Sequence, residues 1–355
     1  MKKLYLLSYS ILNFVIKNLP MTLEERLGTF VKLNQTLLDL SSAEYNEIIT
    51  QAAKNNHWFN ASNVEQAILG LVHLTEPIKM TSWLTGYETK FVKQKIIGLI
   101  MAGNIPLVGF HDLMCILLSG HKAVIKLSSQ DRFLMQWIIQ KICKIEPKFI
   151  NQINICDQLK NMDAVIATGS NNTARYFDYY FGKYPKIIRK NRTSVAVLSG
   201  NETSTELKKL GKDVFTYFGL GCRNVSKILV PKKYDFSPLL DVWTTFKENT
   251  NNFKYQNNYD YNKSIYLVNG TTHLDTGFLL LTESEALTSP ISVLYYQHYQ
   301  SSHDLDQYLL EHQEKIQCVV SGLASKKFIP FGQTQTPEIS DYADGIDVMQ
   351  FLNTI

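Results

Sequence analysis

Cys222 lies in the segment of the sequence with the clearest capacity for covalent chemistry. Residues 217–224 read Tyr-Phe-Gly-Leu-Gly-Cys-Arg-Asn, so two glycines precede the cysteine and an arginine follows it. Glycine allows a tight backbone turn that leaves room for a substrate beside the sulfur. The positive charge of Arg223 favours the thiolate, which is the nucleophilic form of cysteine. The alternative is a small buried cysteine in a glycine turn, and for an isolated cysteine that alternative is the commoner one.

Three further segments place polar groups where predicted strands end. The side-chain amide of Asn104 could donate to an oxyanion, or it could bond its own backbone in a turn. Lys126 closes a strand just before Ser128 and could bind a ribose or a phosphate, although a lone lysine there is more often simply solvated. Gly169 and Ser170 lie between a strand and a helix, where free N–H groups could bind a phosphate, but helix capping by the serine is an equally good explanation.

The remaining cysteines do not form a structural or metal-binding framework. The chain has five cysteines and no Cys-x-x-Cys pair, and an odd number spread this widely indicates neither a disulfide framework nor a zinc site. We therefore interpret the other four as packing residues: Cys115, Cys143, Cys156 and Cys318.

Length and composition limit the classes of protein to consider. A chain of 355 residues predicts roughly two domains of ~150 residues each. A hydrophobic share of 45% excludes a largely disordered chain, and a net charge of +4 is too small to argue for nucleic acid binding.

Hydrophobic periodicity predicts helices first and then an alternation of strands with helices. Residues 22–88 are expected to form helices at Thr22–Leu40, Ala43–Asn55, Asn63–Leu74 and Ile78–Thr85. From about residue 95, short apolar strands alternate with helices, which indicates a parallel α/β sheet covered on both faces. Helices are expected near 110–119, 131–144, 171–182, 204–217 and 303–311, and strands at Ile96–Met101, Ala123–Lys126, Ala164–Ala167, Val195–Leu198, Lys227–Val230, Ile265–Val268, Phe278–Leu281, Ile291–Tyr296 and Cys318–Val320.

Two apolar stretches need weighing as membrane or targeting segments. Residues 96–120 are long enough to span a bilayer, but two glycines and a proline divide them, which favours a strand, a turn and a helix. Residues 1–20 lack a small-x-small cleavage site, whereas Thr22 and Glu25 form a capping box that opens a helix. We interpret residues 1–20 as an extension or a mis-assigned start, with secretion or peripheral membrane association as the alternatives, and we expect a cytoplasmic protein.

A basic run needs separate consideration, because five positive charges fall within ten residues: Lys183, Lys186, Arg189, Lys190 and Arg192. Such a run could bind a nucleic acid, a cofactor phosphate or the phosphates of coenzyme A. The default interpretation is a solvated edge strand.

The familiar nucleotide and hydrolase motifs G-x-G-x-x-G, Walker A, H-E-x-x-H and G-x-S-x-G are absent. From about Met21 to the end, however, successive segments resemble the aldehyde dehydrogenase superfamily, and more narrowly its LuxC-type acyl-CoA reductase branch. That superfamily binds its dinucleotide without the glycine fingerprint, which accounts for the missing motif. The matching segments are GNIPL at 103–107, AVIKLSS at 123–129, ATGS at 167–170, YFGLGCRNVSKILVP at 217–231, SPISVLYY at 289–296 and PFGQTQTPEISDYADGIDVMQFL at 330–352.

The resemblance implies a fold and a role for each of these residues. The fold would be α/β and aldehyde-dehydrogenase-like, with two open parallel sheets and a helical N-terminal region. Cys222 would be the catalytic thiol, which is the most specific match, and Asn104 the amide of the oxyanion hole. The residues that bind the cofactor, NADPH or NADH, would be Lys126, Ser128, Gly169 and Ser170.

The sequence departs from the superfamily pattern at two places. Aldehyde-oxidising members carry a glutamate general base, and alignment on Ser194 places Arg189 at that position, with no carboxylate from residue 179 to 200. Without a base to activate water, an acyl-thioester would persist and exchange with a thiol or accept hydride. The glutamate that contacts the cofactor ribose is also missing in register, which leaves Glu285 or Glu283 as uncertain substitutes.

The resemblance therefore implies reduction of an acyl-CoA, in particular a fatty acyl-CoA, to an aldehyde through an acyl-enzyme at Cys222. It also implies a homo-oligomer, a possible acyl-activating protein partner and no nucleic acid. The alternatives are a non-catalytic nucleotide-binding protein of the same fold, a basic nucleic-acid or membrane-surface binding protein, and an acyltransferase that uses the same thiol. The expected organisation is an extension (1–20), a helical region (21–90), a dinucleotide-binding domain (91–216), a catalytic thiol domain (217–330) and a C-terminal arm (331–355), which could pack on a neighbouring subunit.

Overall fold

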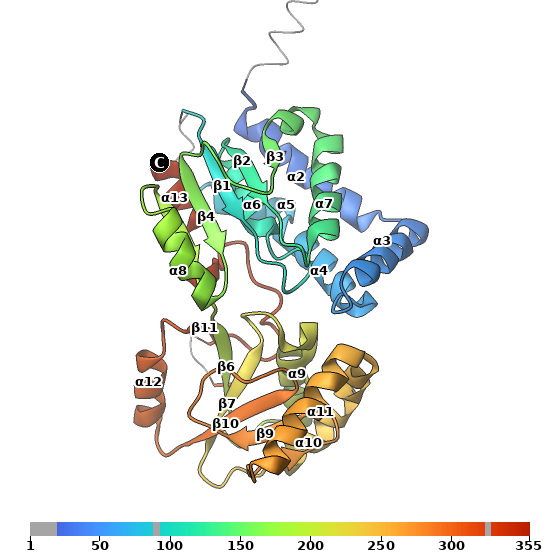
Figure 1. The fold of residues 1–355 in the computed structure, drawn as a ribbon, viewed down its shortest axis with the longest axis vertical. Coiled ribbons are helices and arrows are strands. Elements are labelled where there is room, and N and C mark those ends of the chain that lie inside the picture. The colour runs from blue at the N-terminus through green and yellow to red at the C-terminus, as the bar shows by residue number, and fades with distance from the viewer. Residues whose placement is uncertain (1–19, 88–92, 324–327) are drawn as a thin grey trace, which may run out of the picture.

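The computed structural model describes residues 20–87, 93–323 and 328–355, which fold around two open sheets (Figure 1). Residues 1–19 of the expected extension 1–20 lie outside these ranges. The sheets occupy separate units stacked along the long axis of the molecule, and the chain passes from one to the other between β5 and β6. An α/β fold with parallel sheets is therefore confirmed.

The helical N-terminal region covers one side of the first sheet. Its helices begin with side-chain caps, and Thr22 and Glu25 form the predicted capping box. Apolar residues on their inner faces, such as Phe30 and Leu33, are fully buried in the same core as the first sheet. The four helices are α2 (Leu23–Leu38), α3 (Ser42–Asn55), α4 (Ala61–Leu74) and α5 (Pro77–Leu84).

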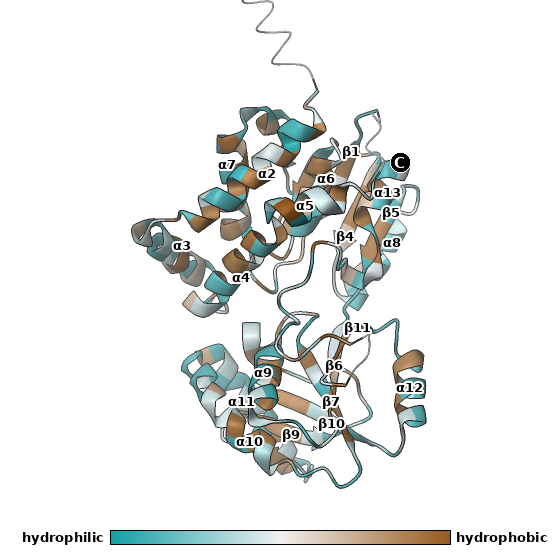
Figure 2. Cartoon of the chain, turned by 180° about the vertical axis from the view of Figure 1, so that it is seen from behind, coloured by the Kyte–Doolittle hydropathy of each residue, from teal (hydrophilic) through white to brown (hydrophobic). Residues whose placement is uncertain are grey.

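The first sheet is parallel and has the order β3-β2-β1-β4-β5. Alternate residues of β1 face opposite cores: Ile97 and Leu99 pack with α6 and α7, whereas Ile96 and Ile100 pack with α8. Figure 2 shows the corresponding pattern, with β1 and β4 mainly hydrophobic and α8 mainly hydrophilic. The elements are β1 (Ile96–Ile100), α6 (Phe110–Leu118), β2 (Lys122–Lys126), α7 (Arg132–Ile145), β3 (Ile153–Ile155), β4 (Ala164–Thr168), α8 (Asn171–Tyr180) and β5 (Lys186–Arg189).

The strand order reverses direction between β1 and β4. The chain runs outward from β1 through β2 to β3, then returns to β4 on the other side of β1 and continues to β5. In open α/β sheets, ligands bind outside the carboxyl ends of the strands at such a switch point. The carboxyl edge beside β1 and β4 is therefore where the fold favours a ligand.

The second sheet has the order β11-β6-β7-β10-β9-β8, with only β8 antiparallel to its neighbour. In Figure 1, helices α9, α10 and α11 lie on one side of this sheet and α12 on the other. The elements are β6 (Thr193–Val197), α9 (Ser204–Phe215), β7 (Val225–Pro231), α10 (Ser237–Trp243), α11 (Phe253–Val268), β8 (Leu274–Asp275), β9 (Leu280–Glu283), β10 (Val293–Tyr299), α12 (Ser302–Glu311) and β11 (Ile316–Ser321).

Two expectations about this half of the chain need correction. The strand expected at Ile265–Val268 is the last turn of α11, because Tyr255, Tyr259 and Asn262 recur at helical spacing and bury one helical face. The change of sheet occurs at residues 190–192 and not at 217, because β6 pairs with β7 and β11 of the second sheet.

The C-terminal end of the arm packs on its own chain. Helix α13 (Val348–Thr354) contacts α6, and its apolar face is buried in the core of the first sheet through Val348, Met349 and Leu352. His121, which immediately precedes β2, forms a hydrogen bond of 3.0 Å from its Nε2 to the carbonyl of Leu352. The last segment of the sequence is therefore part of the first unit.

The apolar stretch 96–120 folds as β1, a turn and α6, as expected. Within the described ranges, no helix combines the length and the apolar character that crossing a membrane requires.

Candidate active site

The backbone that leads to Cys222 is tightly turned. Tyr217, Phe218 and Gly219 all have positive φ angles, of 54°, 56° and 77°, which is a costly conformation for the two aromatic residues. At Gly221, an added Cβ would lie 2.9 Å from Oδ1 of Asn224, so the turn has no room for a side chain there. The two glycines that precede the cysteine thus serve the tight turn predicted from the sequence.

Asn224, which is almost fully buried, holds this turn together and was not singled out from the sequence. Its Oδ1 accepts from the backbone N–H of Gly221 at 2.8 Å, and its Nδ2 donates to the carbonyl of Thr216 at 2.8 Å. The hydroxyl of Ser194 on β6 donates to the carbonyl of Cys222 at 3.0 Å. These bonds fix the backbone on both sides of the sulfur.

Asn104 meets the cysteine segment across the two units. Its Nδ2 donates to the carbonyl of Leu220, two residues before Cys222, at 2.6 Å. The fold therefore brings together the two residues predicted to be catalytic, although they are far apart in the sequence.

The loop that carries Asn104 is itself held in an unusual conformation. Leu107 has a φ of 58°, and its N–H donates to the buried carboxyl of Asp131 at 2.7 Å. A Cβ at Gly103 would lie 2.5 Å from Cβ of Ser128, so only glycine fits there. Asp131, whose pKa burial raises to about 8, thus supports the position of the candidate oxyanion donor.

Cys222 lines a cavity of about 190 Å³ between the two units. One wall is apolar and comes from α4, through Ala67, Gly70, Leu71 and Leu74. The residues 105–112 after β1 form a second wall, and the segment 335–343 of the C-terminal arm forms a third. A mainly apolar cavity that contains a nucleophile and a few polar groups is typical of a small-molecule site.

Arg189 also lines this cavity, and its environment corrects the expectation of a solvated basic run. It ends the edge strand β5, but it is only 4% exposed and binds Asp112 of α6 through two hydrogen bonds, of 2.5 and 3.0 Å. Burial lowers the pKa of Arg189, but the Asp112 carboxylate outweighs burial and the net shift is upward. Arg192 pairs with Asp344 at 3.2 Å and Lys186 with Asp178 at 3.1 Å, so three of the five charges already have a carboxylate partner.

The electrostatic role expected for Arg223 is outweighed by burial. Burial raises the pKa of the Cys222 thiol to about 11, and the nearby positive charge of Arg223 only partly opposes that shift. The guanidinium of Arg223 also donates to the carbonyl of Thr334 at 2.7 Å and lies 3.8 Å from Asp341, so it ties the arm to the cysteine segment. In this structure Cys222 is therefore a protonated thiol at neutral pH.

The four residues expected at the cofactor lie at the carboxyl edge of the first sheet, beside its switch point, and do not line the Cys222 cavity. Lys126 is exposed at the end of β2, and Ser128 accepts from Gln130 N–H at 3.2 Å. Ser170 caps α8 by accepting from Thr173 N–H at 3.2 Å. A Cβ at Gly169 would lie 2.9 Å from Phe177, so the backbone there stays bare at the start of the helix. This edge has the features of a phosphate site.

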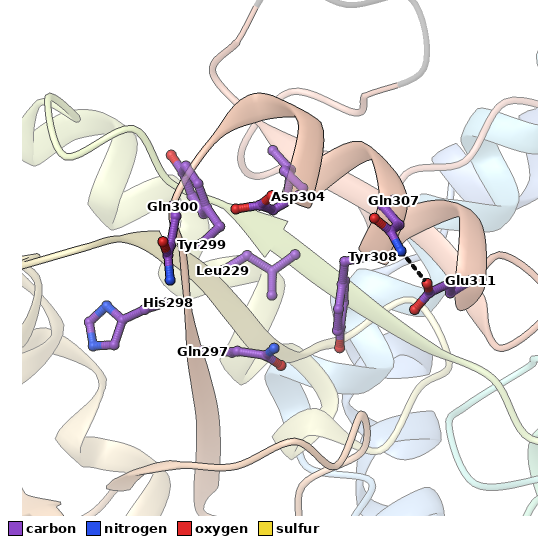
Figure 3. A pocket seen from close by; sticks show the side chains of 10 residues that line it. Leu229, Gln297, His298, Tyr299, Gln300, Asp304, Gln307, Tyr308 and Glu311 are labelled. Carbon is purple, nitrogen blue, oxygen red and sulfur yellow. Dashed lines mark hydrogen bonds between the residues drawn. The ribbon is translucent and has the colours of Figure 1, made fainter.

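A second cavity of about 350 Å³ lies between α12 and the second sheet and contains none of the predicted site residues (Figure 3). Its walls include Tyr299, Asp304 and Tyr308, and the fully buried Lys227 lies beside it, donating to Gln297 Oε1 at 2.6 Å.

Among the described residues, neither of the glutamates suggested as ribose contacts forms a hydrogen bond through its side chain. Glu283 and Glu285 are both exposed, and the backbone carbonyl of Glu285 accepts from the Lys227 ammonium at 3.1 Å. Their proposed role at the ribose stays a prediction.

Comparison with solved structures gives the class of protein. The fold is similar to that of aldehyde dehydrogenase KauB from Pseudomonas aeruginosa (13% identity, TM-score 0.64, 86% of this chain and 73% of that chain). It is also similar to an aldehyde dehydrogenase from Mycobacterium tuberculosis complexed with NAD⁺ (12%, 0.62, 87% and 79%) and to one from Bacillus cereus complexed with NAD⁺ (14%, 0.61, 86% and 73%). The chain thus has an aldehyde-dehydrogenase-like fold.

The family follows from the sequence itself. The model of the acyl-CoA reductase (LuxC) family matches residues 36–236, which is more than half of the chain. No curated protein matches the chain in a sequence search. The chain belongs to the LuxC acyl-CoA reductase family and is an oxidoreductase of acyl-CoA and aldehydes, as the sequence motifs implied.

Proposed function

We propose that the protein reduces an acyl-CoA to an aldehyde through an acyl-enzyme on Cys222. The observation that supports this proposal is the hydrogen bond of 2.6 Å from the Asn104 amide to the carbonyl of Leu220, because it joins the loop of the candidate oxyanion donor to the segment that carries Cys222. The cavity that Cys222 lines gives the acyl group a mainly apolar environment.

In the acylation step, the Cys222 thiol gives up its proton and its sulfur bonds to the thioester carbon. The carbonyl oxygen becomes an oxyanion, which the Asn104 amide and the Cys222 backbone N–H stabilise by hydrogen bonds. The bond from that carbon to the coenzyme A sulfur then breaks, and coenzyme A leaves as its thiol after taking up a proton. The acyl group remains on Cys222 as a thioester.

The surroundings of Cys222 protect this thioester from hydrolysis, which requires a free carboxylate to activate water. Arg189 aligns with the general base of the aldehyde-oxidising members, and each carboxylate that lines the cavity is engaged in an ion pair. Asp112 binds Arg189, Glu338 binds Lys79 at 2.8 Å, and Asp341 lies 3.8 Å from Arg223. The acyl group therefore stays on the thiol until it is reduced or returned to a thiol.

We further propose that Lys126, Ser128, Gly169 and Ser170 hold NADPH or NADH at the carboxyl edge of the first sheet. The bare backbone at Gly169 and the start of α8 fit a pyrophosphate, and the exposed ammonium of Lys126 fits a ribose or a phosphate. When bound, the reduced nicotinamide supplies the hydride. Lys126→Ala should weaken the binding of NADPH or NADH about tenfold, measured by nucleotide fluorescence, without preventing acylation of Cys222.

Mass spectrometry tests the acyl-enzyme directly. The protein is incubated with acyl-CoA and no nicotinamide, and one acyl group is expected on the peptide that contains Cys222. Cys222→Ala should lose the adduct, whereas Cys156→Ala, which removes a cysteine outside the cavity, should retain it. An adduct that persists in Cys222→Ala would refute the proposed nucleophile.

The partners remain predictions that can be tested separately. The resemblance implies a fatty acyl substrate, an acyl-activating protein and a homo-oligomer in the cytoplasm. Light scattering of the purified protein would measure the oligomeric state, and acylation of Cys222 by a free acid only in the presence of a second protein would reveal the activating partner.

A further inference from the structure

Gly70 lies well inside helix α4, where the fold does not require a glycine. A Cβ added at Gly70 would meet no other atom within 4 Å, so packing does not exclude a side chain there. Its backbone is helical, and its φ is not in the positive range that favours glycine. Glycine inside a helix is less stable than alanine, because it loses more conformational freedom on folding. The reason for a glycine at this position therefore lies in the space beside it.

Gly70 is on the face of α4 that is turned towards the cysteine segment. One turn before the cavity wall, the side chain of Asn63 accepts from the backbone N–H of Tyr217 at 3.1 Å. The residues of α4 that line the Cys222 cavity follow at spacings of three and four, which places them on that same side of the helix: Ala67, Gly70, Leu71 and Leu74. A side chain at position 70 would therefore project into the space between α4 and the segment that carries Cys222.

This face of α4 is buried at one end and reaches solvent at the other. Ala67, at the end that follows Asn63, is only 4% exposed. At the other end, His73 lies 3.3 Å from Glu338, which lines the cavity with a side chain that is 52% exposed. Gly70 lies about one helical turn from each end. A chain that runs from Cys222 along α4 to solvent therefore passes the bare backbone of Gly70.

We propose that Gly70 determines which acyl groups the Cys222 cavity accepts, because it leaves open the passage through which a long acyl chain runs along α4 to solvent. This inference rests on the proposed function, since it takes the acyl group to be bound to Cys222. Leu71 and Leu74 on the same face supply apolar contacts to the methylene groups of the chain. A short acyl group ends before it reaches Gly70 and does not depend on this passage.

The test fills the passage with Gly70→Leu and compares kcat/KM for tetradecanoyl-CoA and butanoyl-CoA. Each methylene group that loses its apolar contact should lower kcat/KM about fourfold, so displacement of two or more gives a loss of about tenfold or more for tetradecanoyl-CoA. Butanoyl-CoA should change by less than about threefold, because its chain makes no such contacts beyond Gly70. The expected result is a selective loss of the long substrate.

Gly28→Leu is the matched control. Gly28 lies inside α2, a Cβ there also meets no atom within 4 Å, and the residue does not line the cavity. Both changes replace a helical glycine by a better helix former, so neither should lower the melting temperature measured by calorimetry. Only Gly70→Leu should alter the ratio of the two substrates. Gly70→Ala, which adds one methyl group, should shift that ratio less and in the same direction, and it keeps the test decisive if the larger side chain disturbs the helix.

The inference and the proposed function fail in distinguishable ways. Equal losses with both substrates in Gly70→Leu would mean that the coenzyme A arm, which both carry, passes Gly70, and the inference would be wrong while the acyl-enzyme stands. Unchanged kcat/KM for both substrates, or a wild type that accepts butanoyl-CoA but not tetradecanoyl-CoA, would also overturn it. If neither substrate acylates Cys222 in the wild type, the proposed function fails and the inference fails with it.

Discussion

Replacing Asp112 by asparagine should destabilise the protein strongly, because the change leaves a buried guanidinium without its counter-charge. Arg189 and Asp112 are 4% and 7% exposed, and their two hydrogen bonds lie between β5 and α6 in the wall of the Cys222 cavity. Removal of one partner from a buried ion pair typically costs about 3–5 kcal/mol. The expected loss in the free energy of unfolding of Asp112→Asn is therefore of that size.

The same strand provides a matched control. Lys186, also on β5, pairs with Asp178 at 3.1 Å, and these side chains are 27% and 49% exposed. Solvent screens such a pair, so Asp178→Asn should cost only about 0–1 kcal/mol. Urea denaturation followed by tryptophan fluorescence and by circular dichroism would measure both variants, and agreement of the two probes would support a single transition.

A double variant separates a missing counter-charge from a general disturbance of packing. Asp112→Leu combined with Arg189→Met replaces the ion pair by apolar side chains and should recover most of the lost stability, because no buried charge remains. The reasoning is refuted if Asp112→Asn costs no more than Asp178→Asn. It is equally refuted if Arg189→Met alone costs little and the double variant is merely the sum of the single changes.

Three further predictions concern the groups around the thiol. Alkylation of Cys222 by iodoacetamide should accelerate about tenfold per pH unit from pH 7 towards the thiol pKa of about 11. Arg223→Gln should slow the alkylation at each pH, because it removes a charge that lowers the thiol pKa. An alkylation rate independent of pH would contradict this ionisation of the thiol. Asn104→Ala should reduce the acylation rate constant about 10²–10³-fold in rapid-mixing experiments with little change in KM, and a normal rate constant would exclude Asn104 as an oxyanion donor. Burial raises the pKa of Asp131 from 3.8 to about 8, so the folded chain holds this proton more tightly than the unfolded chain. The wild type should therefore lose stability relative to Asp131→Asn as the pH rises from about 4 to about 8 in urea titrations, and parallel curves would disprove the shift.

Local features of the sequence were sufficient to predict most elements of the first unit. The strands at 96–101 and 123–126 are short apolar runs bounded by glycine or by charge, and tertiary structure did not override them. The turn around Cys222 was also predictable, because glycines permit a tight turn and a turn is set by residues that are neighbours in the sequence. The same local pattern failed at 265–268, where three of the four residues have high β-propensity but the segment continues the helix α11.

The partners of the site residues were beyond prediction because they come from distant parts of the chain. Arg189 belongs to a basic run that suggests exposure, but Asp112, 77 positions earlier, buries it and neutralises it. No local pattern indicated that Gln335 in the arm would line the same cavity as Cys222. Burial also reversed the expected ionisation of that thiol, since desolvation depends on surroundings that only the fold defines.

Because the chain is synthesised from its N-terminus, the C-terminal arm is the last part of the Cys222 cavity to be made. A ribosome makes Asn104 and Cys222, the candidate catalytic residues, more than a hundred residues before it makes the segment 335–343, which closes one wall of the cavity. Helix α13, which anchors that segment on α6, comes later still. The nascent chain therefore presents its thiol without the enclosure that raises its pKa. The cavity around the thiol is therefore completed only when the segment 335–343 has been made and has packed in place.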